Sequence, residues 1–149
     1  MIPLAKLFLK ADENQIRNLI DHYNFNCIDY VKQKRRYAMK YGDNWCAMFV
    51  SVLADLKGYN GSEFPFEVSV LEMIDIASYR HQWVTGTDGI RRGDLIVYNW
   101  NGDFVPDHIG IVTMVLDGTI NVIEGNINNT VGYRTIEKDS DLIMGYIER

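Results

Sequence analysis

Two cysteines and three histidines are the side chains of this sequence best suited to nucleophilic and acid–base chemistry. Cys46 follows two candidate N-cap residues, Asp43 and Asn44, and opens an apolar run that extends to Lys57. A thiol at a helix N-terminus lies at the positive end of the helix dipole, beside unpaired backbone N–H groups, and both favour the thiolate. Cys46 is therefore the candidate nucleophile, the alternative being a small buried hydrophobic residue. Cys27 lies within a packing pattern and is interpreted as a core residue.

A thiolate nucleophile needs a neighbouring base, and histidine is the usual one. His108 begins a predicted strand, so its imidazole can project from the edge of a sheet onto the start of a packed helix. His22 and His81 lie in polar surroundings and are expected to face solvent. We therefore select His108 as the candidate base, the alternative being a structural histidine with satisfied hydrogen bonds.

A third group must orient the imidazole, and Glu124 ends the next predicted strand after an apolar run. The register of the hairpin decides whether it can do so. A three-residue loop at 116–118, with its last residue in the left-handed conformation, places His108, Glu124 and Asn126 on one face of the sheet. A two-residue turn at 117–118 would turn Glu124 to the opposite face. The sequence therefore predicts the three-residue loop.

Metal-binding patterns in this sequence are weak. No CxxC or HExxH pattern occurs, which argues against zinc. Asn99, Asn101 and Asp103 resemble the start of a calcium loop, but Phe104 and Gly110 stand where the turn glycine and the bidentate glutamate belong. We interpret this segment as a hairpin turn and expect no metal and no cofactor.

The helices and strands that must position these residues fall into two halves of the chain, which differ in the spacing of their apolar residues. Apolar residues recur at helical spacing from Asp12 to Tyr79 and then form short strands separated by turn signals. The expected helices lie near 12–20, 28–42, 45–57 and 67–79, and the expected strands at 94–100, 108–115, 119–124, 131–136 and 142–147. The run at 45–57 is apolar almost all round, which indicates a central buried helix. The pattern predicts a single α+β domain over residues 1–149, with this helix on an antiparallel sheet of about five strands.

Composition excludes several classes of protein. The chain has 149 residues, 47% of them hydrophobic, and a formal net charge of −5, which argues against binding nucleic acid by phosphate neutralisation. The basic cluster at 32–36 is interpreted as a solvated helix face. No apolar run approaches the roughly 20 residues of a membrane-spanning helix. The first ten residues lack the basic region and cleavage site of a signal peptide. We expect a monomer that is made in the cytoplasm and does not insert into membranes.

Four motifs of this chain, in order, resemble those of the CHAP family, the cysteine, histidine-dependent amidohydrolases and peptidases. They are Asn44–Ser51, Gly93–Ile96, Pro106–Val112 and Ile123–Asn126. The resemblance implies a papain-like fold in which the nucleophile opens the central helix. It also implies that Cys46 is the nucleophile and His108 the base, and that Glu124 and Asn126 orient the imidazole.

The resemblance further implies the substrate, since CHAP proteins mostly cleave bacterial peptidoglycan as phage endolysins, virion-associated lysins or bacterial autolysins. We expect an amide bond to be cut, either between muramic acid and L-alanine or within the stem or cross-bridge peptide. The oxyanion would lie against the backbone N–H of Cys46, with Tyr41 or Tyr37 as side-chain donors. Ala47 differs from the aspartate typical of calcium-binding members, so no structural calcium is expected.

Access to the wall would come through a membrane pore, from a virion or by a dedicated secretion system. The alternatives are an amidase that acts on an amide outside the wall, and a non-catalytic virion structural or wall-binding protein.

Overall fold

The computed structural model describes residues 1–28, 37–60 and 63–149 and shows an α+β fold. The helices are α1 (Ile2–Leu7), α2 (Glu13–His22), the π-helical turn η1 (Tyr23–Cys27), α3 (Cys46–Lys57) and α4 (Val70–Tyr79). The strands are β1 (Trp83–Thr85), β2 (Leu95–Tyr98), β3 (His108–Val115), β4 (Thr119–Ile127), β5 (Thr130–Glu137) and β6 (Ile143–Ile147). The expected α+β class is confirmed, with six strands where about five were predicted.

The helices near the N-terminus differ from the prediction in two places. No helix was expected before residue 12, yet α1 lies there and contains Pro3, because proline is compatible with the first turn of a helix. The helix predicted at 28–42 lies partly outside the described residues, and its described part, 37–42, is not helical. The basic cluster at 32–36 also lies outside them. None of the described helices is long and apolar enough to cross a membrane.

The start of α2 follows the prediction closely. Asp12 is its N-cap, and the Asp12 carboxylate accepts a hydrogen bond from the backbone N–H of Gln15. The Gln15 side chain accepts one in return from the Asp12 N–H, which completes a capping box. The side chains of Ile16, Leu19 and Ile20 are buried, so this amphipathic helix presents one apolar face to the core.

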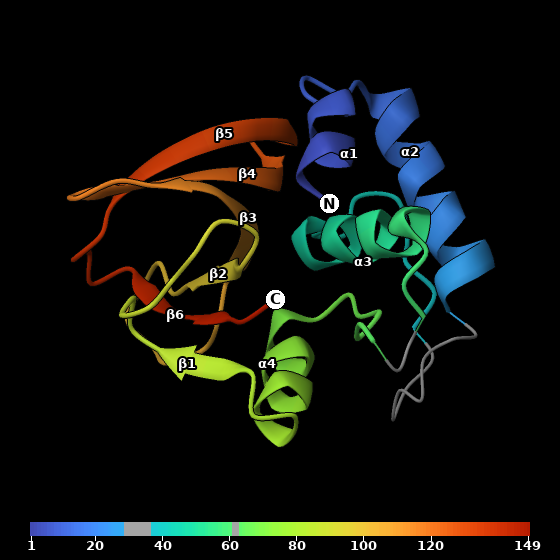
Figure 1. The fold of residues 1–149 in the computed structure, drawn as a ribbon. Coiled ribbons are helices and arrows are strands. Elements are labelled where there is room, and N and C mark those ends of the chain that lie inside the picture. The colour runs from blue at the N-terminus through green and yellow to red at the C-terminus, as the bar shows by residue number, and fades with distance from the viewer. Residues whose placement is uncertain (29–36, 61–62) are drawn as a thin grey trace.

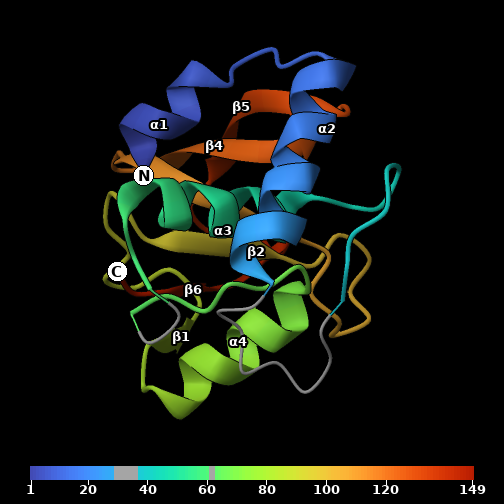
Figure 2. The same ribbon diagram turned by 90° about the vertical axis from the view of Figure 1, so that its right-hand side faces the viewer.

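Helix α3 is the centre of the fold. Its first nine residues are all buried, and Gly58 ends it in the left-handed conformation that a side chain disfavours. Figures 1 and 2 show α3 between the sheet and α2, with α1 packed alongside α3 and next to β4. Burial on both sides explains why its sequence has no polar face.

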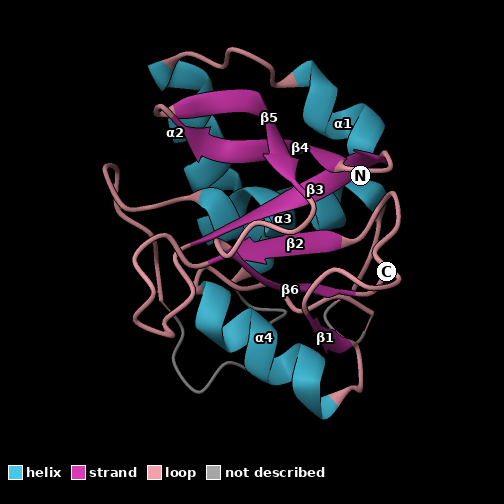
Figure 3. Ribbon diagram, turned by 90° about the vertical axis from the view of Figure 1, so that its left-hand side faces the viewer, coloured by secondary structure: helices cyan, strands magenta, loops and turns pink. Residues whose placement is uncertain are grey.

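The sheet is strongly curved, and its strand order is β1-β6-β2-β3-β4-β5 with every neighbouring pair antiparallel (Figure 3). Successive side chains of a strand point to opposite faces of the sheet, and here they contribute to two separate hydrophobic clusters. Ile109, Ile111 and Ile123 belong to the cluster that contains α3, whereas Tyr98 and Val122 belong to the cluster on the other face. The N-terminal end of β3 is therefore flanked by α3 on one face and by aromatic residues on the other.

Candidate active site

Cys46 is the first residue of α3 and is buried. The N-cap of the helix is Trp45, which makes no side-chain capping bond. The predicted caps lie just upstream, where the Asp43 carboxylate instead accepts hydrogen bonds from the Lys40 N–H and the Tyr37 hydroxyl. The helix N-terminus thus keeps its partial positive charge for an anion at Cys46.

His108 is the first residue of β3 and is 7% exposed. Its Nε2 lies 3.1 Å from Oε2 of Glu124, and its imidazole interacts electrostatically with Cys46. Burial acts to lower the pKa of His108, but the hydrogen bonds and charges of Cys46 and Glu124 outweigh it. Together they raise the pKa to about 9. His108 is therefore an imidazolium at neutral pH.

The carboxylate of Glu124 is fully buried and reaches His108 by a register different from the predicted one. The N–H of Leu116 donates to the carbonyl of Thr119, so the connection is a two-residue turn at 117–118, and Gly118 is not left-handed. The predicted three-residue loop is wrong. A β-bulge at Thr113 shifts the pairing by one residue and restores the face that the turn alone would have lost.

Gly110 explains how a buried carboxylate fits between the strands. A Cβ atom added at this position would lie 2.7 Å from Cγ of Glu124 and 2.5 Å from Cγ1 of Val122. Only glycine leaves this volume to the Glu124 side chain, which then extends to the imidazole two residues away on β3.

Three residues that sequence reasoning missed complete the surroundings of Glu124. Arg134 on β5 donates from Nε to both carboxylate oxygens, at 2.9 and 3.0 Å. Tyr98 stacks on the imidazole of His108 with ring centroids 5.9 Å apart, and Trp100 stacks on Tyr98 at 4.6 Å. In the sequence, Tyr98 and Trp100 are indistinguishable from core aromatics at a strand end. Arg134 pairs with Val122 and therefore lies on the Glu124 face, which only the register of β5 on β4 reveals.

The other predicted site residues lie nearby with different partners. The Asn126 amide lies 3.4 Å from Oδ1 of Asn44 and has no hydrogen bond to the imidazole. The hydroxyl of Tyr41 donates to Asp21 at 2.6 Å, and that of Tyr37 donates to Asp43 at 2.8 Å. The structure therefore brings together Cys46, His108 and Glu124, and it places the remaining three beside the N-terminal segment of α3.

One group of described residues has the composition of a metal site. The side chains of His22, Cys27 and Asp55 offer ligand atoms within 4.8 Å of one another. His22 was expected to face solvent but is half-buried, and its Nε2 lies 2.7 Å from the carboxylate of Asp55. This distance is that of a direct charge-assisted hydrogen bond, with no space for an ion between the two atoms. Burial, followed by the charge of Asp55, raises the pKa of Cys27 to about 12, so its thiol stays protonated.

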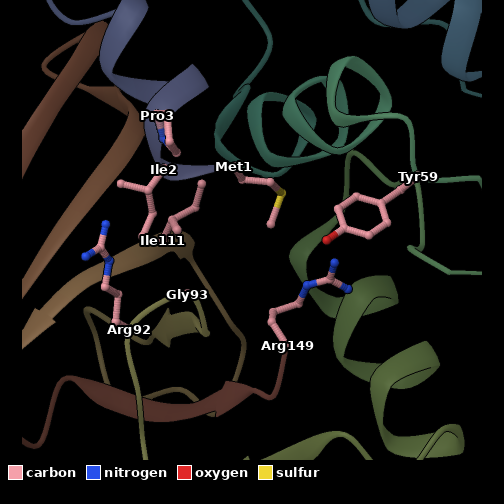
Figure 4. Close-up of a pocket in the computed structure, with 8 residues that line it drawn as sticks. All are labelled: Met1, Ile2, Pro3, Tyr59, Arg92, Gly93, Ile111 and Arg149. Atoms are coloured by element: carbon pink, nitrogen blue, oxygen red, sulfur yellow. The ribbon is translucent and has the colours of Figure 1, made fainter.

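A cavity of about 210 Å³ lies outside this site (Figure 4). Tyr59, Arg92 and Arg149 are among its lining residues, and none of the candidate catalytic side chains reaches it. The guanidinium of Arg149 points toward Tyr59 in the figure and packs over the rings of Tyr59 and Phe64 at 4.9 and 4.5 Å. None of the candidate catalytic residues is therefore part of this cavity.

The arrangement can perform nucleophilic acyl transfer. A thiol at a helix N-terminus contacts an imidazolium, and a buried carboxylate orients that imidazolium from its other nitrogen. In a comparison with known families, the family model described as the CHAP domain matches residues 19–126, which is more than half of the chain. No curated protein and no solved structure matches the chain.

Proposed function

The chain belongs to the CHAP domain family, which is one of amidases and peptidases, and from this premise we propose that it cleaves an amide bond of bacterial peptidoglycan. The observation that carries the proposal is the grouping of Cys46, His108 and Glu124, in which Nε2 of His108 lies 3.1 Å from the Glu124 carboxylate and the pKa of His108 is raised to about 9. In the proposed reaction, a thiolate–imidazolium pair of Cys46 and His108 is the reactive state, as in cysteine hydrolases generally.

The proposed reaction has two half-reactions. The Cys46 thiolate attacks the amide carbonyl carbon, and the resulting oxyanion accepts a hydrogen bond from the Cys46 backbone N–H. His108 gives its proton to the leaving nitrogen, the C–N bond breaks and a thioester remains. Neutral His108 then takes a proton from water, the hydroxide attacks the thioester, and the carboxylic acid leaves as the dyad is restored.

The position of His108 assigns one nitrogen to each task. Nε2 contacts Glu124, which leaves Nδ1 to face Cys46 and the substrate nitrogen. A carboxylate on Nε2 stabilises the imidazolium and fixes the plane of the ring. Tyr37 and Tyr41 already donate to aspartates, so the backbone N–H of Cys46 is the primary oxyanion donor in this proposal.

Two exposed aromatic side chains support a substrate with sugar rings. Trp100 is 37% exposed and Phe104 is 90% exposed, and both lie on the segment that leads directly into His108. Side-chain oxygens of Asn99, Asp103 and Asp107 accept hydrogen bonds from backbone N–H groups within this segment and hold it in a defined turn. Rigid aromatic faces beside a nucleophile suit a glycan that carries peptide stems.

The test is digestion of purified peptidoglycan followed by mass spectrometry of the fragments. We expect new amino and carboxyl ends from one amide bond, either the muramoyl-L-alanine bond or a bond of the stem or cross-bridge peptide. Cys46→Ala abolishes release, and Cys27→Ala is the matched control because that thiol lies outside the site. If wild-type protein binds walls but releases nothing from any wall type, a non-catalytic wall-binding role replaces the proposal. Cleavage of small amides alone would identify an amidase that acts outside the wall.

A further inference from the structure

Arg134 is the one residue on β5 that contacts the buried carboxylate of the candidate site. Its Nε lies 2.9 Å from Oε1 and 3.0 Å from Oε2 of Glu124. The Glu124 side chain is fully buried, whereas that of Arg134 is 30% exposed. Arg134 thus reaches from the surface to a carboxylate that has no access to water.

The charges of the site alternate when Arg134 is included. The Glu124 carboxylate lies between two cationic side chains, those of His108 and Arg134. Removing Arg134 takes one of these partners from a carboxylate that is fully buried. A buried carboxylate that loses a partner takes up a proton or moves toward solvent, because an unpaired buried charge is costly.

Aromatic rings fix the guanidinium in place. The Cζ atom of Arg134 lies 4.7 Å from the ring centre of Trp100 and 5.7 Å from that of Tyr98. Tyr98 also stacks on His108, so one aromatic pair supports both cations that flank Glu124. Cation–π contacts of this kind favour a flat guanidinium over a lysine ammonium.

We propose that Arg134 is a positioning residue, which holds the Glu124 carboxylate aimed at Nε2 of His108. Arg134 is proposed to act through Glu124, with no contact to the substrate. Its kinetic consequence rests on the proposed function, but its effect on the titration of His108 does not. Residues 19–126 carry the family match, so Arg134 lies outside the matched segment.

The direct test is NMR titration of the three histidine side chains in Arg134→Gln. His22 and His81 serve as internal references. We expect the His108 midpoint to fall by about one pH unit or more, because a displaced Glu124 no longer stabilises the imidazolium. Direct loss of a nearby positive charge acts in the opposite direction. An unchanged or raised midpoint would therefore overturn the proposal, since Arg134 would then only compete with His108 for the carboxylate.

Arg134→Lys is the second variant, and it tests the proposal even where Arg134→Gln does not fold. Lysine keeps the charge and so should retain the His108 midpoint, but it lacks the planar stack on Trp100. We expect kcat to fall several-fold with KM unchanged, because a loosely held orienting group costs rate. Wild-type kcat in this variant would contradict the role of Arg134.

Arg92→Met is the control, since it removes one positive charge from an exposed turn remote from Glu124. It should leave both the His108 midpoint and kcat unchanged. If wild-type protein proves inactive on every wall while the His108 midpoint still falls in Arg134→Gln, the proposed function fails and the positioning of Glu124 by Arg134 stands.

Discussion

Replacing Glu124 by glutamine should narrow the pH range of activity from its alkaline side. The pKa of His108 is raised from 6.5 to about 9, with Glu124 and Cys46 both raising it against the effect of burial. With a pKa of about 9, roughly 0.9 of the imidazole is protonated at pH 8, whereas an ordinary value of 6.5 leaves about 0.03. Complete loss of the shift therefore reduces the rate at pH 8 by roughly thirtyfold, and loss of half of it by about threefold.

The same substitution has little effect on protonation at pH 6, because even an ordinary histidine is about three-quarters protonated there. Poorer orientation of the ring reduces the rate equally at both pH values. The ratio of mutant to wild-type kcat/KM at pH 8, divided by that ratio at pH 6, thus isolates the electrostatic effect of Glu124.

The assay is clearance of a purified peptidoglycan suspension across pH 5 to 10, with Glu137→Gln as a charge-matched control on the exposed end of β5. We expect the alkaline limb of Glu124→Gln to move to lower pH and that of the control to stay. Superimposable alkaline limbs for Glu124→Gln and wild type would refute the reasoning, because the charge of Glu124 would then not govern the imidazolium.

Four further outcomes follow from the same geometry. Iodoacetamide at neutral pH should label Cys46 before Cys27, because a pKa of about 12 keeps the Cys27 thiol protonated. Peptide mapping that finds Cys27 labelled first would contradict the assignment of Cys46 as the nucleophile. Gly110→Ala should lower the free energy of unfolding by about 1–3 kcal/mol and reduce kcat, since a methyl group displaces the Glu124 side chain. Denaturant titration and kinetics measure the two effects, and wild-type values would show that Glu124 does not need the volume left by Gly110. Because the folded-state pKa of His108 is raised, its stabilisation is fully present below pH 6.5 and is lost as the pH rises through about 9. Its upper bound is about 3 kcal/mol, measurable as a decline in unfolding free energy that is absent in His108→Gln. EDTA should leave hydrolysis unchanged, and restoration of an EDTA-sensitive activity by calcium or zinc would show that a metal takes part.

Local signals in the sequence were sufficient to predict the central helix and the candidate nucleophile. An apolar run that begins at Cys46 and stops at Gly58 fixes the ends of α3, because the run needs burial and the glycine needs a positive φ. His108 begins one predicted apolar strand and Glu124 ends the next, and the structure places Nε2 of His108 3.1 Å from Oε2 of Glu124. These inferences depend on the spacing of apolar residues and on single residues that begin or end a helix or strand, and both can be identified in the local sequence.

Features that depend on distant partners were not predictable in the same way. Strand β1 has only three residues and exists because it pairs with β6, some sixty positions later. The contact of Arg134 with Glu124 requires the register of β5 on β4, and nothing in the local sequence around Arg134 marks it as more than a surface charge. The Asn126 amide was expected beside the imidazole but lies against Asn44, at a position where β4 is irregular and Asn126 itself has a positive φ.

The hairpin between β3 and β4 shows why a correct face can follow from an incorrect turn. The face of the sheet on which the Glu124 side chain lies depends on whether the number of residues inserted into the hairpin is odd or even. A bulge adds one residue, just as a longer loop does. The prediction placed the extra residue in the loop at 116–118, whereas the structure places it at Thr113, whose hydroxyl donates to the carbonyl of Asn121. For Glu124 to face His108, the hairpin must contain one extra residue. This requirement does not determine whether the extra residue lies in the loop or in a bulge. Thr113 lies two residues after Ile111, so the bulge falls between the turn and the candidate site.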